Sequence, residues 1–384
     1  MSSSKNVSLL ELFLYFFRLS WTAFGGPLAY ISMMEDDCVE KRRWLSKEEF
    51  TEMLGITNML PGPNAAEMAI HIGYVKRGLV GGILSGFAFV TPSFIIILFL
   101  SWLYFQYRTI PAVGDIFYGI NPVIVVIILA TAYRLGRSSI VDWKLFCVFI
   151  AAFLVSYFTE VNEAIILLVA GLTGIILYTP KSVYASAKDY KKLNPLIPSI
   201  VLFDLSTEYM PTLLFVFLEF LKAGCLLFGN GLVIIPLIGP DVISFGWVSE
   251  KEFFDGVTLG QITPGPVMKT AAFIGYKVAG VPGALIAFLG VYLPPFLIVP
   301  VVSSSFRKVK DNLLLKNFLK GISAAVVGTI FAVVISLSKV AFVDYITLLI
   351  AVICLILVIK FKVNVSLLVI GAGVLGLIIK SLFL

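Results

Sequence analysis

The sequence has little charge, a single histidine and no paired cysteines, and each shortage excludes a class of protein. Charged residues make up 14% of the 384 residues, whereas a soluble domain has about 25%. His71 is the only histidine, which excludes a histidine-rich metal site. The four cysteines are scattered and form no C-x-x-C pair, so neither a zinc site nor a disulfide framework is indicated.

Signals for catalysis and for secretion are also missing. The chain has no G-x-S-x-G, H-E-x-x-H or Walker A motif, so we do not expect an enzyme, and we expect no cofactor. ATP-driven pumping would need an associated subunit. The N-terminal segment "MSSSKNVSLL" has one lysine and no small-residue cleavage site, which is unlike a removable signal peptide.

Apolar residues dominate what is present. Hydrophobic residues make up 59% of the chain, and the mean hydropathy is +1.00. Runs such as Leu79 to Tyr104 exceed the roughly 18 apolar residues that indicate a membrane span. Because the runs are continuous rather than alternating, they predict a polytopic α-helical membrane protein and not a β-barrel. The net charge of +6 then reflects loop placement rather than nucleic-acid binding.

The chain repeats itself about 203 residues further on. "WLSKEEF" at 44–50 aligns with "WVSEKEF" at 247–253, and "AFGGP" at 23–27 aligns with "LFGNG" at 227–231. Such self-similarity indicates a duplicated unit. We expect two homologous membrane repeats joined by a basic cytoplasmic linker, with domain limits at 1–180, 181–209 and 210–384.

The same helix breaker stands in both repeats: Pro61-Gly62-Pro63, which we call the first breaker, and Pro264-Gly265-Pro266, the second. Proline lacks a backbone N–H and clashes with the preceding turn, so each breaker should end one short helix and start another. The pieces have about 12–14 residues, too few to cross a bilayer. A broken helix at membrane depth is tolerated only inside protein or beside a wet cavity. We therefore expect one re-entrant helical hairpin per repeat.

The remaining apolar segments predict five spanning helices per repeat. In the first repeat they are 9–34, 79–106, 117–135, 143–158 and 162–178. In the second they are 212–239, 280–303, 321–338, 345–359 and 364–381. An odd number of spans forces the two repeats into inverted orientations. If the breakers instead cross fully, each repeat has six spans and this account fails.

The charges favour the inverted arrangement. With the N-terminus outside, most lysines and arginines collect on the cytoplasmic side, including Arg77, whereas Arg108 and Lys339 lie outside. The basic loop "EKRRWLSKEE" at 40–49 corresponds to "SFGWVSEKEFF" at 244–254, which has one lysine against two glutamates. Inverted repeats explain that difference. The expected topology is ten spans with both termini outside.

Inverted repeats with discontinuous helices are typical of transporters, whose sites lie near the bilayer midplane. Each breaker frees backbone N–H groups at a helix start, and helix N-termini suit anions. The candidate substrate-binding residues around the breakers are Asn58, Pro61, Gly62, Pro63, Asn64, Glu67, Gln261, Pro264, Gly265, Pro266 and Lys269. Asn58 and Gln261 precede the two breakers at matching positions and could hydrogen-bond an oxyanion.

Ionisable residues inside apolar segments are functional hypotheses by default. Arg18 and Lys222 occupy corresponding places in the first helix of each repeat. The alternative to a functional role is that their side chains extend to the membrane–water interface. A pair between Glu67 and Lys269 across the repeats is a further hypothesis, the alternative being that either faces a loop. His71 could titrate in a proton-coupled cycle, or simply lie at the interface.

The chain resembles the chromate transporter family over nearly its whole length. The matching elements are "FGGP", "W-L-S-x-x-E-F", "N-x-L-P-G-P", "G-Y-x-x-x-G-x-x-G" and F-x-x-P ending at Pro92. The duplicated arrangement is similar to the long, two-domain form. The resemblance adds Gly25, Gly26, Gly229 and Asn230 to the candidate site. The second repeat departs from the motif, since Asn230 and Gly231 replace Gly26 and Pro27, so substrate contacts are expected more from the first repeat.

The resemblance implies a carrier in the inner membrane that exports chromate, with sulfate as a competing analogue, driven by the membrane potential or a proton gradient. The expected partners are a small inorganic oxyanion and the lipid bilayer, without nucleic acid, and a homodimer is compatible with the sequence. The alternative function is an anion channel, or a carrier for a different small anion, on the same scaffold.

Overall fold

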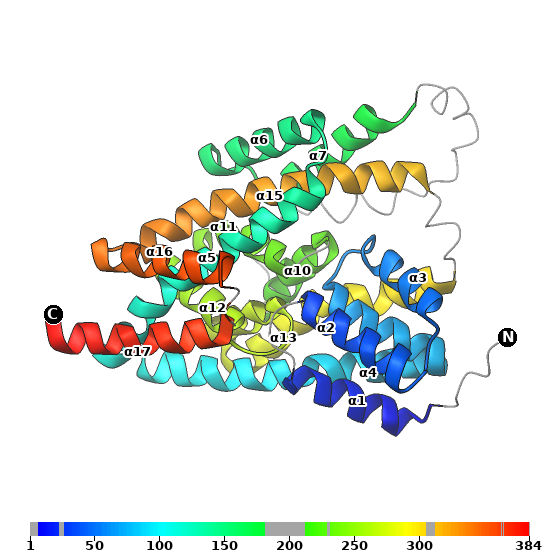
Figure 1. Ribbon diagram of the computed structural model, residues 1–384, viewed down its shortest axis with the longest axis horizontal. Coiled ribbons are helices and arrows are strands. Elements are labelled where there is room, and N and C mark those ends of the chain that lie inside the picture. The colour runs from blue at the N-terminus through cyan, green and yellow to red at the C-terminus, as the bar shows by residue number, and fades with distance from the viewer. Residues whose placement is uncertain are drawn as a thin grey trace.

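The computed structural model describes residues 7–22, 27–180, 212–228, 231–304, 312–361, 363 and 365–383 (Figure 1). This part of the chain is built from helices, and its β-type pairing is an isolated bridge between Pro61 and Phe228. Four candidate site residues lie outside the described residues, namely Gly25, Gly26, Gly229 and Asn230, as does the predicted linker at 181–209.

The first helices form a hairpin rather than one span. α1 (Leu9–Thr22) and α2 (Pro27–Glu35), which continues into the π-helix η1 (Asp36–Lys41), run in opposite directions. Arg42 Nη1 lies 3.2 Å from Glu11 Oε1, and the ring of Trp44 lies 5.2 Å from that of Tyr15. The predicted single helix at 9–34 is therefore wrong. Two helices stand in its place, and the second begins at Pro27, because proline fits the start of a helix.

A second hairpin carries the first breaker. α3 (Lys47–Thr57) starts at Ser46, whose hydroxyl accepts from the Glu49 amide in a capping box. The helix α4 (Asn64–Tyr107) contains a reversal at Arg77 and Gly78, where the φ of Gly78 is +61°. A Cβ on Gly73 would lie only 2.2 Å from the carbonyl oxygen of Gly81, so the two arms, 64–76 and 79–107, pack closely against each other. α4 is thus a short arm followed by a long one.

The second half of the chain repeats both hairpins. α10 (Thr212–Leu226) pairs with the 3-10 turn η4 (Gly231–Val233) and α11 (Ile234–Ser244), so the predicted helix at 212–239 is also divided. α12 (Glu250–Ile262) leads to the second breaker, followed by the 3-10 turn η5 (Val267–Lys269) and α13 (Thr270–Ser304).

The reversal in α13 matches the reversal in α4. It falls at Ala279 and Gly280, and the φ of Gly280 is +61°, as it is at Gly78. The two glycines are aligned in the sequence repeat, so equivalent residues make the turn in both halves. A φ in this left-handed region is accessible to glycine without the steric cost that a side chain would add.

The last two helices of each half pack against a long helix of the other half. α6 (Trp143–Phe158) and α7 (Glu163–Tyr178) pack on α15 (Leu313–Ala341), as Figure 1 shows. α16 (Tyr345–Ile359) and α17 (Val365–Phe383) pack in the same way on α5 (Pro111–Ser139). Glycines make these contacts close: a Cβ on Gly119 in α5 would lie 1.9 Å from the carbonyl oxygen of Ala372 in α17.

The fold is that of an all-α membrane protein. Among the described residues, four helical segments are long and apolar enough to cross a membrane: Asn64–Tyr107, Pro111–Ser139, Thr270–Ser303 and Leu313–Ala341. The shorter apolar helices are Trp143–Phe158, Glu163–Tyr178, Gly231–Ser244, Tyr345–Ile359 and Leu367–Leu382. Large apolar side chains such as Leu79, Phe87 and Leu289 are exposed along the long helices, as a lipid-facing surface requires.

The division of the first helix also changes the end of the molecule at which α1 is expected to start. Arg77 Nε donates to the carbonyl oxygen of Val7 at 2.5 Å, so the start of α1 lies beside the reversal of α4. The predicted topology placed the N-terminal segment and Arg77 on opposite sides of the membrane. That prediction is wrong at Val7, because α1 returns as α2 instead of crossing.

Candidate functional site

The first breaker is attached to the glycine-rich segment of the second half. The amide of Gly62 donates to the carbonyl oxygen of Leu227 at 2.6 Å, next to the bridge between Pro61 and Phe228. Leu227 and Phe228 begin the "LFGNG" segment that links α10 to η4. Two hairpin tips, one from each half, therefore meet at the first breaker.

The second breaker makes the reciprocal contact with the first half. The amide of Gly265 donates to the hydroxyl of Tyr30 at 2.5 Å. Tyr30 lies on α2, three residues after the proline of "FGGP", and its ring packs edge-on against Phe89 at 5.2 Å. In both halves the central glycine of the breaker thus donates its N–H to the first hairpin of the other half.

The packing beneath the breakers is matched as well. A Cβ on Gly62 would lie 3.2 Å from Pro295 Cβ in α13, and one on Gly265 would lie 2.3 Å from Ser93 Cβ in α4. Ser93 and Pro295 directly follow Pro92 and Pro294, which are aligned in the repeat. Gly62 has a φ of +153° and Gly265 a φ of +104°. Only glycine combines that backbone with such a close approach, so both tips lie at the interface between α4 and α13.

Polar groups gather around the first breaker. Asn64 Nδ2 donates to Asn58 Oδ1 at 2.6 Å and so bridges the break. Glu67 is fully buried, and Gly62 lies so near that a Cβ there would be 2.7 Å from Glu67 Oε1. Neither carboxylate oxygen has a hydrogen-bond partner among the described residues, and the same holds for His71 Nδ1, one turn further along the helix.

The Lys269 side chain binds the backbone carbonyl groups at the second breaker. Its ammonium donates to the carbonyl oxygens of Thr263, Pro264 and Gly265 at 2.6, 2.7 and 3.1 Å. Prolines supply no N–H to the break, so these carbonyls need donors from elsewhere, and an ammonium has three. The predicted pair of Glu67 with Lys269 is therefore wrong, since each side chain turns to the breaker of its own half.

Among the other predicted polar residues, Gln261 is half-buried, and its amide nitrogen has no hydrogen-bond partner in the described part of the chain. Arg18 is exposed on α1. Lys222 lies 2.8 Å from both Glu219 Oε1 and Asp241 Oδ2. The charge of Lys222 is thus compensated within the α10–α11 hairpin, whereas Arg18, at the corresponding position, lies on the surface.

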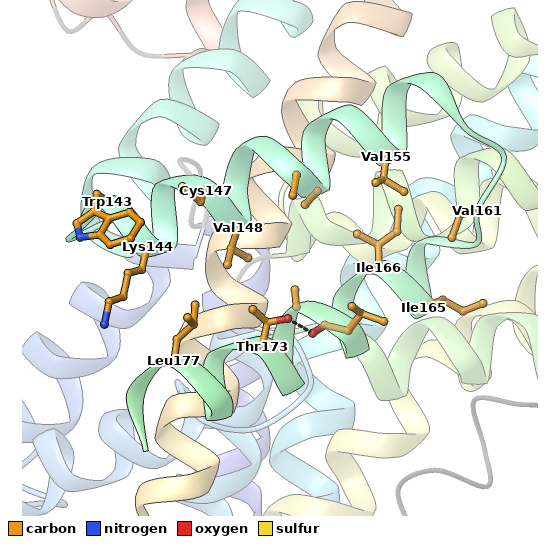
Figure 2. A pocket seen from close by; sticks show the side chains of 14 residues that line it. Trp143, Lys144, Cys147, Val148, Val155, Val161, Ile165, Ile166, Thr173 and Leu177 are labelled. Atoms are coloured by element: carbon orange, nitrogen blue, oxygen red, sulfur yellow. Dashed lines mark hydrogen bonds between the residues drawn. The ribbon is translucent and has the colours of Figure 1, made fainter. Parts of the chain in front are cut away.

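The first breaker is closed to the outside, since Gly62, Pro63 and Asn64 are buried, whereas Pro264 and Gly265 of the second breaker are half-buried. A cavity of about 720 Å³ reaches Thr263 and Pro264, but its other lining side chains, from α5, α12 and α17, are apolar. A second cavity of about 420 Å³ lies between α6 and α7, with Trp143 and Lys144 at one end (Figure 2). These apolar linings fit hydrocarbon and offer little to a hydrated oxyanion.

Sequence reasoning missed a buried carboxylate on the helix before the second breaker. Asp255 accepts from the Tyr104 hydroxyl at 2.7 Å and from Asn121 Nδ2 at 3.3 Å. Thr258 Oγ donates to Asn121 Oδ1 at 3.0 Å, which joins α12 to α5. The signal was an acidic residue on the apolar stretch "FFDGV". Tyr30, Ser93 and Pro295 were missed because their contacts with the breakers are long-range.

Taken together, the helices and the matched tips define an all-α membrane protein built on a duplicated plan. The family model described as "Chromate transporter" matches the chain twice, at residues 10–175 and 214–377. The chain belongs to the chromate transporter family.

Relatives match over most of the chain. It is 36% identical over 375 residues to the "Chromate transport protein" of Cupriavidus metallidurans, covering 97% of this chain and 93% of the relative. It is 34% identical to the "Probable chromate transport protein" of Synechococcus elongatus, covering 97% and 96%. It is 30% identical to the "Chromate transport protein" of Pseudomonas aeruginosa, covering 87% and 82%. No solved structure matches the chain.

Proposed function

We propose that this protein is a secondary active transporter of a tetrahedral oxyanion, with chromate as substrate. Export across the cytoplasmic membrane, driven by the membrane potential or a proton gradient, is part of the proposal, and sulfate is the expected analogue. The names of the relatives support chromate as the substrate. The observation that carries the proposal is the reciprocal contact of the two breakers with the other half's first hairpin.

The proposed substrate site lies where these tips meet. The helix after the first breaker begins at Asn64, and the amides of Asn64 and Ala65 precede its first turn of backbone hydrogen bonds. The helix after the second breaker begins as the 3-10 turn at Val267. Helix N-termini attract anions through their free N–H groups and dipole. The glycine segments, with Gly25, Gly26, Gly229 and Asn230, complete the proposed site.

The transporter is proposed to consist of two inverted repeats, with limits near 1–180 and 210–384, whose hairpins are re-entrant. In support, the first-half hairpins have the ends opposite their tips beside Arg77 and Val7. The second-half hairpins have theirs beside Glu252, which binds both Arg108 and Lys277. The long arm of α4 joins these two ends of the molecule, and its 29 or so residues extend about 43 Å. The hairpins of the two halves would thus enter from opposite faces.

The distribution of basic residues supports the proposal that the protein crosses the cytoplasmic membrane several times. Lys144 and Lys320 lie over the Tyr178 ring at 5.6 and 5.0 Å, at one end of α15, and Lys339 lies over the Tyr157 ring at 5.3 Å, near the other end. α6 therefore extends along α15 from near Lys320 to near Lys339. Because the more basic end faces the cytoplasm in membrane proteins, the Tyr178 end is the proposed cytoplasmic face.

Transport by purified protein in proteoliposomes tests this function. Vesicles loaded with unlabelled chromate should take up labelled chromate by counterflow, at a rate that saturates with concentration and falls when sulfate is added. Protein-free vesicles are the control. A flux that never saturates and shows no counterflow would identify an anion channel instead, and no chromate movement would contradict chromate as substrate.

A further inference from the structure

Glu67 stands out because an ionised carboxylate does not suit its surroundings. It is fully buried, and neither oxygen has a hydrogen-bond partner among the described residues. Its side chain turns back to the first breaker, where a Cβ on Gly62 would lie 2.7 Å from Glu67 Oε1. Burying an unpaired, unsolvated charge is costly enough that such a group takes up a proton instead. In this closed arrangement Glu67 is therefore a neutral acid.

The neighbouring ionisable groups do not compensate a charge on Glu67. On the elements that pack against α4, Lys269 of η5 is held by three carbonyls, Asp255 of α12 by Tyr104 and Asn121, and Lys277 of α13 by Glu252. The other such groups include His71 of α4 itself, Tyr15 and the exposed Arg18 of α1, Tyr30 of α2, the exposed Lys47, Glu48, Glu49 and Glu52 of α3, and Tyr292 of α13. Among the described ion pairs and hydrogen bonds, none joins one of these to Glu67.

The position of Glu67 links its proton to the anion. Glu67 lies in the first turn of the helix whose N-terminus is proposed to bind the oxyanion, and it reaches back over the breaker. An ionised carboxylate there would repel a dianion at short range. A protonated one would not, and it could donate a hydrogen bond to the anion. The second half has Thr270 at the aligned position, so only one such carboxylate serves the site.

We propose that Glu67 is the proton-binding residue of the transport cycle, taking up one proton when the anion is enclosed and releasing it when the tips open to water. This rests on the proposed transport function and specifies its coupling. The proton and the anion move together, so a dianion transfers one net negative charge. The inside-negative membrane potential then drives export, whereas an acidic exterior opposes it.

Accumulation against a pH gradient tests the inference. Proteoliposomes with equal potassium on both sides and valinomycin hold the voltage at zero, and the interior is set one pH unit more alkaline than the exterior. One proton per chromate predicts about tenfold accumulation of labelled chromate inside by the wild-type protein. Glu67→Gln should exchange chromate by counterflow but should not accumulate it, because the amide donates a hydrogen bond without releasing a proton.

Glu163→Gln is the matched control. Glu163 is also a buried glutamate with one unpartnered oxygen, but it lies on α7, where the Ser156 hydroxyl donates to it at 2.6 Å. This variant should accumulate chromate as the wild type does. Equal accumulation by Glu67→Gln and wild type would overturn the inference, as would loss of accumulation in Glu163→Gln alone. The Glu67→Gln comparison also removes the effect of chromate's own protonation, which both proteins share.

A measurement on the wild type alone covers the case in which Glu67→Gln does not fold. With voltage clamped, a pH dye inside the vesicles should report one proton entering per chromate, and a count of zero overturns the inference. Counterflow without proton-driven accumulation would overturn this coupling and leave the transport function standing. An absence of counterflow in the wild type would overturn the transport function, and the coupling with it.

Discussion

Lys269 and Glu67 stand at adjacent aligned positions of the repeat and have opposite surroundings. The ammonium of Lys269 has three carbonyl partners, whereas Glu67 has no partner among the described residues. Lys269 therefore stabilises the second breaker in its observed form, and its charge is committed to the backbone. On the mechanism proposed above, the first breaker with its lone carboxylate is the one that responds to protons and anions.

Removing the donors of Lys269 should destabilise the protein. Lys269→Met keeps much of the length of the side chain but leaves three carbonyls, of the buried Thr263 and the half-buried Pro264 and Gly265, without their donor. Since each hydrogen bond to a charged group contributes roughly 1.5–3 kcal/mol, we expect a loss on the order of 3 kcal/mol or more. A lower thermal midpoint of the detergent-solubilised protein would show it. Lys277→Met, which removes a more exposed ion pair with Glu252, should cost under about 1 kcal/mol, and equal costs would contradict this assignment.

Gly62 should tolerate no side chain. Gly62→Ala would place Cβ 2.7 Å from Glu67 Oε1 and would force a left-handed backbone on alanine. Strain of this kind costs on the order of 1–3 kcal/mol, and relief would require the Glu67 side chain and the first breaker to shift. We expect chromate counterflow to fall at least tenfold, measured at matched protein levels. Gly55→Ala, where a Cβ meets nothing within 4 Å, should transport normally.

Between elements, a polar cluster fastens the α10–α11 hairpin to the turn between α6 and α7. Lys222 bridges Glu219 and Asp241, and Asn162 Nδ2 donates to Asp241 Oδ2 at 3.2 Å. Glu219 is 1% exposed. The cluster therefore connects the second half's first hairpin to a helix pair contributed by the first half.

Breaking this cluster on one side should cost more than removing it as a unit. Lys222→Met leaves two carboxylates without their cation, and removal of one partner of a buried pair costs about 3–5 kcal/mol. Adding Glu219→Gln to Lys222→Met should recover part of that loss, because it removes one of the uncompensated charges. Thermal midpoints of the two variants give the comparison. If the double variant is the less stable of the two, the charges do not interact in this way.

At the scale of the whole molecule, accessibility from the two sides of the membrane tests the proposed orientation. Glu48 and Lys251 occupy aligned, exposed positions of the repeat. In a background without the four natural cysteines, Glu48→Cys should react with a membrane-impermeant maleimide only from the cytoplasmic side. Lys251→Cys should react only from outside. Labelling of both from one side would contradict inverted repeats.

A third position tests on which side of the membrane α1 starts. Ser8 is exposed and adjoins Val7, which is bonded to Arg77. Ser8→Cys should therefore be labelled from the same side as Glu48→Cys. Labelling from the same side as Lys251→Cys would instead indicate that the first helix crosses the membrane.

The class of protein, the duplication and both helix breakers followed from the sequence by itself. Each depends on local chemistry: apolar content selects the bilayer as solvent, and a Pro-Gly-Pro run, with two prolines within three residues, interrupts a helix. The aligned glycines Gly78 and Gly280 make equivalent reversals in the structure. Members of an aligned pair adopt the same backbone because the same short-range constraints act on both.

Only the tertiary structure decided which groups meet. The sequence suggested a Glu67–Lys269 pair, yet the carbonyls freed by the second breaker lie nearer to Lys269 than any carboxylate does. The apolar segment at 9–34 has the length of a span, yet it folds back on itself, because Arg42 and Trp44 pack on Glu11 and Tyr15. Several sets of contacts compete at such places, and the outcome depends on how close the groups come in space, which the sequence does not state.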